Sequence, residues 1–125
     1  MIKGTLIIES LREATSLTEF RFTVTEVSRG RPKLSPQQIA VGVAPVWCVI
    51  EFELEEERAG KLADRLAGAL DPIGWYANFS SSTETYVVYP GRTFRYPRGD
   101  PAGRGQAQDY GRKLGIPEPQ LNWTE

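Results

Sequence analysis

Three arginines lie within seven residues of one another and alternate with aromatic side chains in the C-terminal half of the chain. The segment contains Arg92, Arg95 and Arg98, with Phe94 and Tyr96 between them. Guanidinium groups present several N–H donors in a fixed plane, which suits the binding of phosphate and carboxylate groups. The pattern therefore predicts that a site for a small anion, if the protein has one, consists of Arg92, Arg95, Tyr96 and Arg98.

The spacing of these side chains limits how many of them can act together. In a regular strand Arg92 and Tyr96 point to one face and Arg95 points to the other, because successive side chains alternate. Asp100 is an expected helix N-cap, and its carboxylate would bind the free backbone N–H groups that could otherwise hold an anion. A solvated surface is therefore the alternative interpretation of the arginine cluster.

Few other residues have the types and spacing that catalysis or metal binding needs. Glu51 and Glu53 share one face of an expected strand, about 6 to 7 Å apart, but a solvated strand end is the favoured interpretation. Cys48 is the only cysteine and the chain has no histidine, which excludes an internal disulfide, a cysteine-rich zinc site and Ser-His-Asp or Cys-His catalysis. Cys48 is expected to be a small buried side chain. No phosphate-binding loop or dinucleotide-binding motif occurs, so we expect neither a cofactor nor a metal.

The composition predicts one globular domain spanning residues 1–125. The chain has 125 residues, 25% of them charged, and a net charge of -1, which gives no general attraction to nucleic acid or to a membrane surface. Its longest apolar run, residues 44–50, is far shorter than the about 20 residues of a membrane-spanning helix. The N-terminal segment lacks the features of a signal peptide. We therefore expect a cytoplasmic protein with no membrane segment, and we do not expect nucleic acid as a partner.

The apolar periodicity of the first part of the chain predicts three strands and a helix. The strands are expected over residues 5–9, 20–25 and 46–54. The third alternates most regularly and turns one set of side chains to the core: Val46, Cys48, Ile50, Phe52 and Leu54. Residues 28–45 contain three prolines and two glycines, which predicts a long loop without a helix. An amphipathic helix is expected over residues 55–70.

The second part of the chain predicts three further strands and a second helix. The strands are expected over residues 75–79, 84–89 and 92–96, separated by a polar turn and by Pro90-Gly91. Asp100 and Pro101 predict the start of a helix that ends at Gly115, with an apolar stripe of Ala107, Tyr110 and Leu114. This order of elements predicts an α+β fold with a largely antiparallel sheet of about five to six strands. We expect the two helices to cover one face of the sheet in a ferredoxin-like variant.

Two strings in the C-terminal half resemble a family of small, uncharacterised bacterial proteins. They are GWYANFSSSTETYVVYPGRTFRYPRGD, residues 74–100, and GIPEPQLNW, residues 115–123. The similarity covers roughly residues 71–123. The resemblance implies a bacterial cytoplasmic protein, but it implies no activity, cofactor or catalytic residue for this chain.

These observations leave several classes of function open. The leading hypothesis is a non-enzymatic domain that interacts with a protein or binds a small ligand, such as a small anion. One alternative is a histidine-free enzyme or an anion- or nucleotide-binding domain that uses arginine, tyrosine and carboxylate side chains. Another is an inhibitor or immunity-type protein that masks a partner. Because small α+β domains often bury an exposed sheet edge by pairing, we also expect a homodimer.

Overall fold

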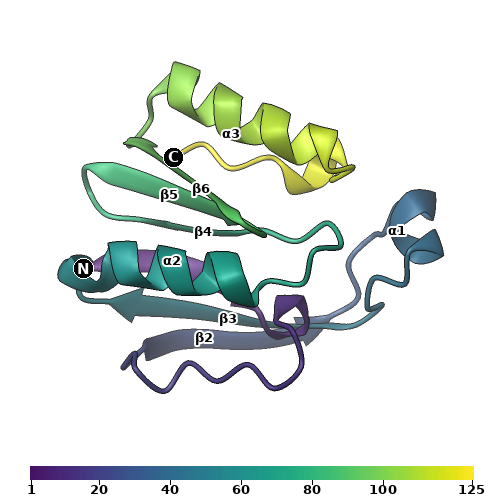
Figure 1. Ribbon diagram of the computed structural model, residues 1–125, viewed down its shortest axis with the longest axis horizontal. Helices are drawn as coiled ribbons and strands as arrows, with labels where there is room; N and C mark the ends of the chain where they lie inside the picture. The colour runs from purple at the N-terminus through teal and green to yellow at the C-terminus, as the bar shows by residue number, and fades with distance from the viewer.

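Six strands form one sheet in the order β2-β3-β1-β4-β5-β6, with every neighbouring pair antiparallel (Figure 1). The computed structural model describes residues 1–125. The strands are β1 (Ile2–Ile7), β2 (Thr23–Gly30), β3 (Trp47–Leu54), β4 (Ala77–Ser80), β5 (Glu84–Tyr89) and β6 (Arg92–Pro97). The α-helices are α1 (Pro36–Ala40), α2 (Ala59–Ala69) and α3 (Pro101–Lys113), and short 3-10 turns occur at η1 (Ile8–Ser10), η2 (Glu56–Arg58) and η3 (Glu118–Gln120). The predicted α+β class and largely antiparallel sheet are confirmed.

The first strand of the chain is inserted between two strands that follow it in sequence. Both β3 and β4 pair antiparallel with β1, so they run parallel to each other, and α2 connects them. Such a split β-α-β unit is a component of ferredoxin-like folds. The arrangement is therefore compatible with the ferredoxin-like variant that the sequence predicts.

One hydrophobic core lies between the sheet and α2. Its members come from β1, β3, β4 and β5 on the sheet side and from Leu62 and Leu66 on the helix. At its centre the backbone of Gly4 lies against Phe52 and Phe79, and a methyl group on Gly4 would come within 2.6 Å of the Phe79 Cβ. The Phe79 Cβ, the Asn78 carbonyl and the Phe52 ring thus fill the space that a side chain at residue 4 would need.

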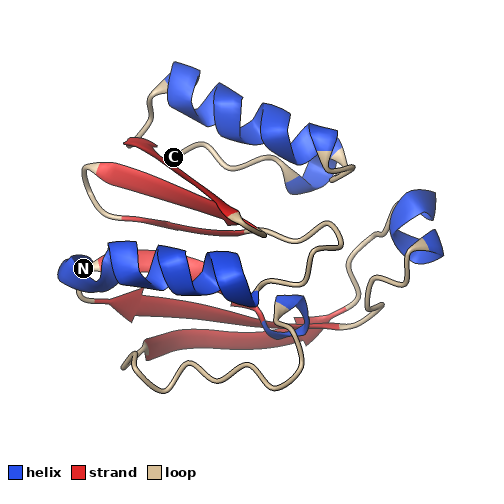
Figure 2. Ribbon diagram, in the orientation of Figure 1, coloured by secondary structure: helices blue, strands red, loops and turns tan.

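A second core lies on the opposite face of the sheet, beneath α3. Within β5, Tyr86 and Val88 belong to the α2 core, whereas Val87 and Tyr89 belong to the α3 core. Successive side chains of a strand point to opposite faces, so β5 is buried on both sides and the two long helices lie on opposite faces (Figure 2). The expectation that both helices cover one face is wrong.

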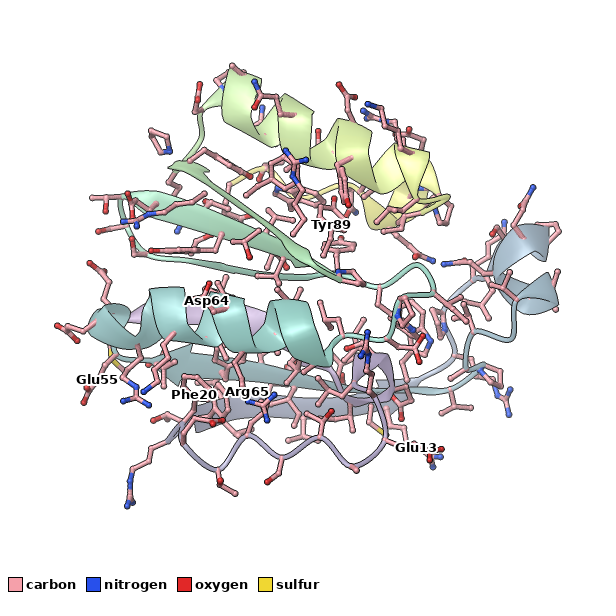
Figure 3. The ribbon with its side chains drawn as sticks, viewed as in Figure 1. Glu13, Phe20, Glu55, Asp64, Arg65 and Tyr89 are labelled. Carbon is pink, nitrogen blue, oxygen red and sulfur yellow. The ribbon has the colours of Figure 1, made fainter.

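Small residues form the face of α3 that contacts the sheet. The contacts are made at Gly103, Ala107 and Gly111, four residues apart, where the helix backbone approaches the side chains of β5 and β6. The Tyr89 hydroxyl lies between sheet and helix and donates a hydrogen bond of 2.6 Å to the carbonyl of Ala107 (Figure 3). Leu114 is 39% exposed, so its predicted place in the buried stripe is wrong.

Both ends of α3 follow the predicted capping pattern. The Asp100 carboxylate accepts hydrogen bonds from the backbone N–H groups of Ala102 and Gly103. At the other end Gly115 has a φ of 85°, and the Ile116 N–H donates to the carbonyl of Gly111 over 3.1 Å. This is the glycine-terminated end that the sequence predicts.

The segment before β3 differs most from its prediction. The strand expected over residues 20–25 begins at Thr23 and extends to Gly30. Phe20 packs into the α2 core from the preceding coil (Figure 3), and the Arg58 guanidinium lies over its ring. Residues 28–45, expected to form a loop without a helix, contain the end of β2 and the short helix α1. The local reason is a capping box, in which Ser35 and Gln38 exchange side-chain and backbone hydrogen bonds.

Candidate ligand-binding groove

A cavity of about 290 Å³ lies on the face of the sheet that α2 does not cover, beside the C-terminal segment. The side chains that line it from the strands alternate with those of the α2 core. In the register of the sheet Thr5 lies opposite both Glu51 and Asn78, and Lys3 lies opposite Ser80. The open face of β3, β1 and β4 therefore brings together residues that are distant in sequence. We call this cavity and its lining of Lys3, Thr5, Glu51, Asn78, Ser80 and Arg98 the groove.

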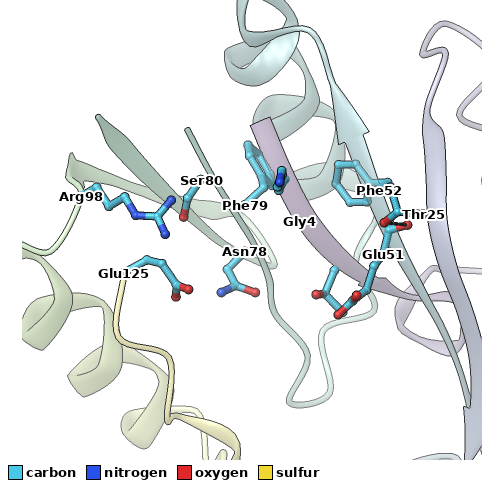
Figure 4. A pocket seen from close by; sticks show the side chains of 11 residues that line it. Gly4, Thr25, Glu51, Phe52, Asn78, Phe79, Ser80, Arg98 and Glu125 are labelled. Atoms are coloured by element: carbon cyan, nitrogen blue, oxygen red, sulfur yellow. Dashed lines mark hydrogen bonds between the residues drawn. The ribbon is translucent and has the colours of Figure 1, made fainter. Parts of the chain in front are cut away.

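Charged side chains of both signs face the groove from opposite sides. Figure 4 shows Arg98 and Glu125 on one side and Glu51 and Thr25 on the other, with Asn78 between them. Neither Arg98 nor Glu51 forms an ion pair within the chain. Their charges are therefore available to a bound molecule.

The turn after β6 fixes the position of Arg98. Its backbone N–H donates to the carbonyl of Thr83, and its guanidinium donates to the carbonyl of Ser81, both over 2.8 Å. A guanidinium has five N–H donors, so this anchor leaves further donors for a ligand. Beside it the Ser80 and Thr85 hydroxyls form a buried hydrogen bond of 3.1 Å, which holds the adjoining wall of the groove.

A second cavity, of about 230 Å³, shares Thr5 and Asn78 with the groove and is more apolar. Trp47 and Trp75 line it with their ring centroids 4.9 Å apart, and the Trp47 indole N–H donates to the carbonyl of Ala44 over 2.8 Å. We call it the tryptophan cavity. A molecule lying across both cavities would meet charged groups at one end and aromatic rings at the other.

A pair of glutamines connects the wall of the tryptophan cavity to α1. Gln120 of η3 lines the cavity, and its side-chain amide exchanges hydrogen bonds of 2.9 and 3.2 Å with the amide of Gln38 in α1. The Tyr76 hydroxyl donates to the backbone carbonyl of Gln120. The C-terminal segment therefore lines the tryptophan cavity directly, and α1 contacts that segment through Gln38.

The structure separates the four residues that the sequence predicts as an anion site. Arg92 lies over the rings of Phe94 and Tyr110, with its guanidinium carbon 4.7 and 5.2 Å from the ring centroids. Tyr96 is buried, and its hydroxyl accepts a hydrogen bond of 2.9 Å from the Trp123 indole. Only Arg98 reaches the groove.

Arg95 lies on the other face of β6, as the alternation predicts. Its guanidinium pairs with Glu84 through a hydrogen bond of 2.9 Å from Nε and lies 5.2 Å from the centroid of the Tyr86 ring. Arg95 is therefore already paired with another residue of the chain, and its guanidinium lies on the opposite face of the sheet from the groove that Arg98 lines. It provides a natural control for experiments on the groove.

The carboxylates and the cysteine of β3 also have defined places. Glu51 lines the groove, whereas the Glu53 carboxylate lies 3.8 Å from the Lys3 ammonium. No three histidine, cysteine, aspartate or glutamate side chains lie together as a metal site would require. Cys48 is half-buried rather than fully buried as expected, and its backbone N–H donates to the Glu9 carboxylate over 2.6 Å.

Sequence reasoning missed most of the residues that line the groove. Lys3 lies before the strand expected at residues 5–9, and neither Thr5 nor Asn78 belongs to a recognisable motif. One feature of the sequence could have indicated two of them. Side chains alternate between the two faces of β3 and of β4, and this alternation places Glu51 and Asn78 on the face opposite the α2 core. Alternation does not say which strands are neighbours, so it could not bring these side chains together.

Comparisons with models of protein families, with curated proteins and with solved structures found no match. None of the helices has the length and apolar character needed to cross a membrane.

The half-buried Tyr76, which lines the tryptophan cavity, predicts a loss of stability at alkaline pH. Burial raises the pKa of Tyr76 from 10.0 to about 12. Above pH 10 the unfolded chain loses this proton while the folded chain keeps it, so the free energy of unfolding falls as the pH rises. At pH 11 the raised pKa of Tyr76 lowers the free energy of unfolding by about 1.4 kcal/mol relative to neutral pH.

Urea titrations at pH 8 and pH 11 measure this effect, with Tyr76→Phe as the comparison. The phenylalanine variant has no proton to lose at this position, so its stability should fall less between the two pH values. An equal fall in both proteins would show that Tyr76 titrates normally in the folded state.

Proposed function

We propose that this protein is a non-enzymatic binding domain whose groove takes a small organic anion. The observation that carries the proposal is the groove itself, where Arg98 faces Glu51 across Thr5 and Asn78, and neither charge is paired. The lack of histidine, the usual general base near neutral pH, supports binding over acid–base chemistry.

The groove suits a ligand with a carboxylate at one end and an apolar or aromatic part at the other. Arg98 would bind the carboxylate with the donors that Ser81 does not use. Asn78 can donate or accept, and Glu51 can only accept, so the ligand would need a hydroxyl or amino group facing Glu51. The apolar part would lie in the tryptophan cavity, against Trp47 and Trp75.

Calorimetric titration with phosphate, nucleotides, dicarboxylates and aromatic carboxylates tests this proposal. We expect an aromatic carboxylate to bind to the wild type and to lose about 10-fold or more in affinity in Arg98→Ala, because a hydrogen bond to a charged group is removed. Arg95→Ala is the matched control, since it removes an arginine three residues earlier whose guanidinium lies on the opposite face of the sheet. Binding unaffected by Arg98→Ala, or no binding of any compound, would refute the assignment.

We also propose that the protein acts as a homodimer in a bacterial cytoplasm. The cytoplasmic and bacterial setting rests on the resemblance of residues 71–123 and on the composition. The homodimer is supported by the open edge of the sheet at β2. Sedimentation at micromolar concentration would contradict it if the species present had the chain mass of 14.0 kDa.

A further inference from the structure

The charged side chains that line the groove are of both signs, so the groove attracts a simple anion at one point only. Lys3 and Arg98 supply positive charge, and Glu51 and Glu125 supply negative charge. Lys3 already lies 3.8 Å from the Glu53 carboxylate. An anion bound at Arg98 would therefore be repelled by two carboxylates in the same cavity. A molecule with one charge of each sign is attracted at both of its ends.

The register of the sheet gives the distance between the two ends of the groove. Glu51 and Asn78 lie on either side of Thr5 on neighbouring strands, so they are two strand spacings, or about 10 Å, apart. Ser80 lies two residues beyond Asn78 on β4, about 7 Å along the strand. The backbone positions of Glu51 and Ser80 are therefore about 12 Å apart, and their side chains leave the same face of the sheet.

Arg98 lies at the Ser80 end of this span and Glu51 at the other end. The Arg98 guanidinium donates to the carbonyl of Ser81, the residue after Ser80, over 2.8 Å. Glu51 is exposed, and Asn78 lies between the two charges (Figure 4). The groove thus offers a carboxylate site at Arg98 and an ammonium site at Glu51, with an amide between them.

A dipeptide has the length that joins these two sites. Two extended residues span about 7 Å, and a charge-assisted hydrogen bond of about 2.8 Å at either end extends the reach of the molecule to about 12 to 13 Å. A free amino acid reaches only about 9 Å, and a tripeptide reaches about 16 Å. The peptide group of a dipeptide would lie over Asn78, whose side-chain amide can both donate and accept.

The tryptophan cavity indicates which residue of the dipeptide is aromatic. The cavity includes Thr5, which lies opposite Glu51, and continues along β1 to Ile7. Arg98 lies at the other end of the groove and does not line this cavity. The cavity therefore opens beside the ammonium site, so a ring that packs against the two tryptophans belongs to the N-terminal residue.

We infer that the ligand of the groove is a zwitterionic dipeptide with an aromatic N-terminal residue. Its carboxylate binds Arg98, its ammonium group binds Glu51, and its ring lies in the tryptophan cavity. The inference rests on the proposed function, from which it takes the carboxylate at Arg98. It adds the second charge, the length of the ligand and the order of its two residues.

The test is calorimetric titration of the full chain with phenylalanyl-glycine and with its N-acetyl derivative. Acetylation removes the ammonium charge and keeps the ring and the carboxylate. We expect it to lower the affinity about 10-fold or more, because a hydrogen bond between charged groups is lost. Glycyl-phenylalanine carries its ring on the other residue and free phenylalanine is too short, so both should bind more weakly than phenylalanyl-glycine.

Substitutions of single carboxylates test the assignment of the ammonium group to Glu51. In Glu51→Gln the free and acetylated dipeptides should bind with similar affinity, because the negative charge that favours the free amine is absent. Glu53→Gln is the matched control, since its carboxylate lies beside Lys3 and does not line the groove, and it should keep the preference for the free amine. Loss of that preference in Glu125→Gln but not in Glu51→Gln would place the ammonium group beside Arg98 and overturn the inference.

The outcomes separate this inference from the proposed function. If the acetylated dipeptide binds as tightly as the free one, and Arg98→Ala weakens both, the dipeptide assignment is overturned and the binding of an aromatic carboxylate stands. Equal affinity for glycyl-phenylalanine and phenylalanyl-glycine would also overturn the assignment. If neither dipeptide nor any aromatic carboxylate binds, the inference and the proposed function both fail.

Discussion

Replacing Phe52 with alanine will lower the free energy of unfolding by about 3 to 5 kcal/mol. Phe52 is 2% exposed, and its ring packs edge-on against Phe22 with centroids 4.9 Å apart. The substitution removes apolar contacts and leaves a cavity over Gly4, where no side chain can fill it. Denaturant titration of the wild type and the variant gives the difference directly.

Val49→Ala is the control for Phe52→Ala. Val49 lies on the same strand but on the opposite face and is only half-buried, so its truncation should cost much less. If Phe52→Ala costs under about 1 kcal/mol, the strand is turned by one residue from the phase described, because such a shift exchanges the two faces.

Replacing Gly103 with alanine will destabilise the protein, although alanine is the better helix former. A methyl group at this position would lie 2.6 Å from the Tyr96 Cγ and closer still to the Tyr96 Cβ, which the β6 backbone holds in place. Overpacking of this kind costs about 1 to 3 kcal/mol. The helix must move away from the sheet or Tyr96 must leave its hydrogen bond with Trp123.

Gly105→Ala, two residues further along α3, is the matched control. Nothing lies within 4 Å of a methyl group at Gly105, so alanine there should stabilise the protein by about 0.5 to 1 kcal/mol through helix propensity. The two variants carry the same chemical change and should move the unfolding midpoint in opposite directions. Equal effects would mean that α3 does not approach the sheet at Gly103.

Local signals in the sequence predicted the elements that depend on local chemistry. The alternation around Phe52, the turn at Pro90-Gly91, the Asp100 cap and the end of α3 at Gly115 all have their predicted form. Each of these depends on residues close together in the chain. This is why the fold class and most element boundaries could be predicted.

The packing of α3 could not be predicted from apolar periodicity. Its buried face consists of Gly103, Ala107 and Gly111, and glycine contributes nothing to a hydrophobic pattern. Of the predicted stripe, Ala107 is buried in the second core and Tyr110 packs against that core, whereas Leu114 is exposed. Tyr89 and Tyr96 fill the space between helix and sheet, so only the face of α3 that carries small residues can pack there.

The groove could not be predicted from the sequence for a different reason. Its lining depends on the insertion of β1 between β3 and β4, which brings Thr5 beside Glu51 and Asn78. Nothing in the alternation of a single strand specifies that order. Of the predicted cluster, Arg98 reaches the groove because it lies beyond the regular part of β6, in the turn.

The double burial of β5 has a consequence for the chain before it folds. Residues 85–89, TYVVY, are all buried, carry no charge and have high β-propensity. Such a segment, exposed on a nascent or unfolded chain, is prone to intermolecular β-aggregation. Glu84 and Pro90 border it directly, in the positions where charged residues and prolines act as gatekeepers. The strand whose four residues Tyr86 to Tyr89 join the two cores is therefore also a segment that needs protection during synthesis.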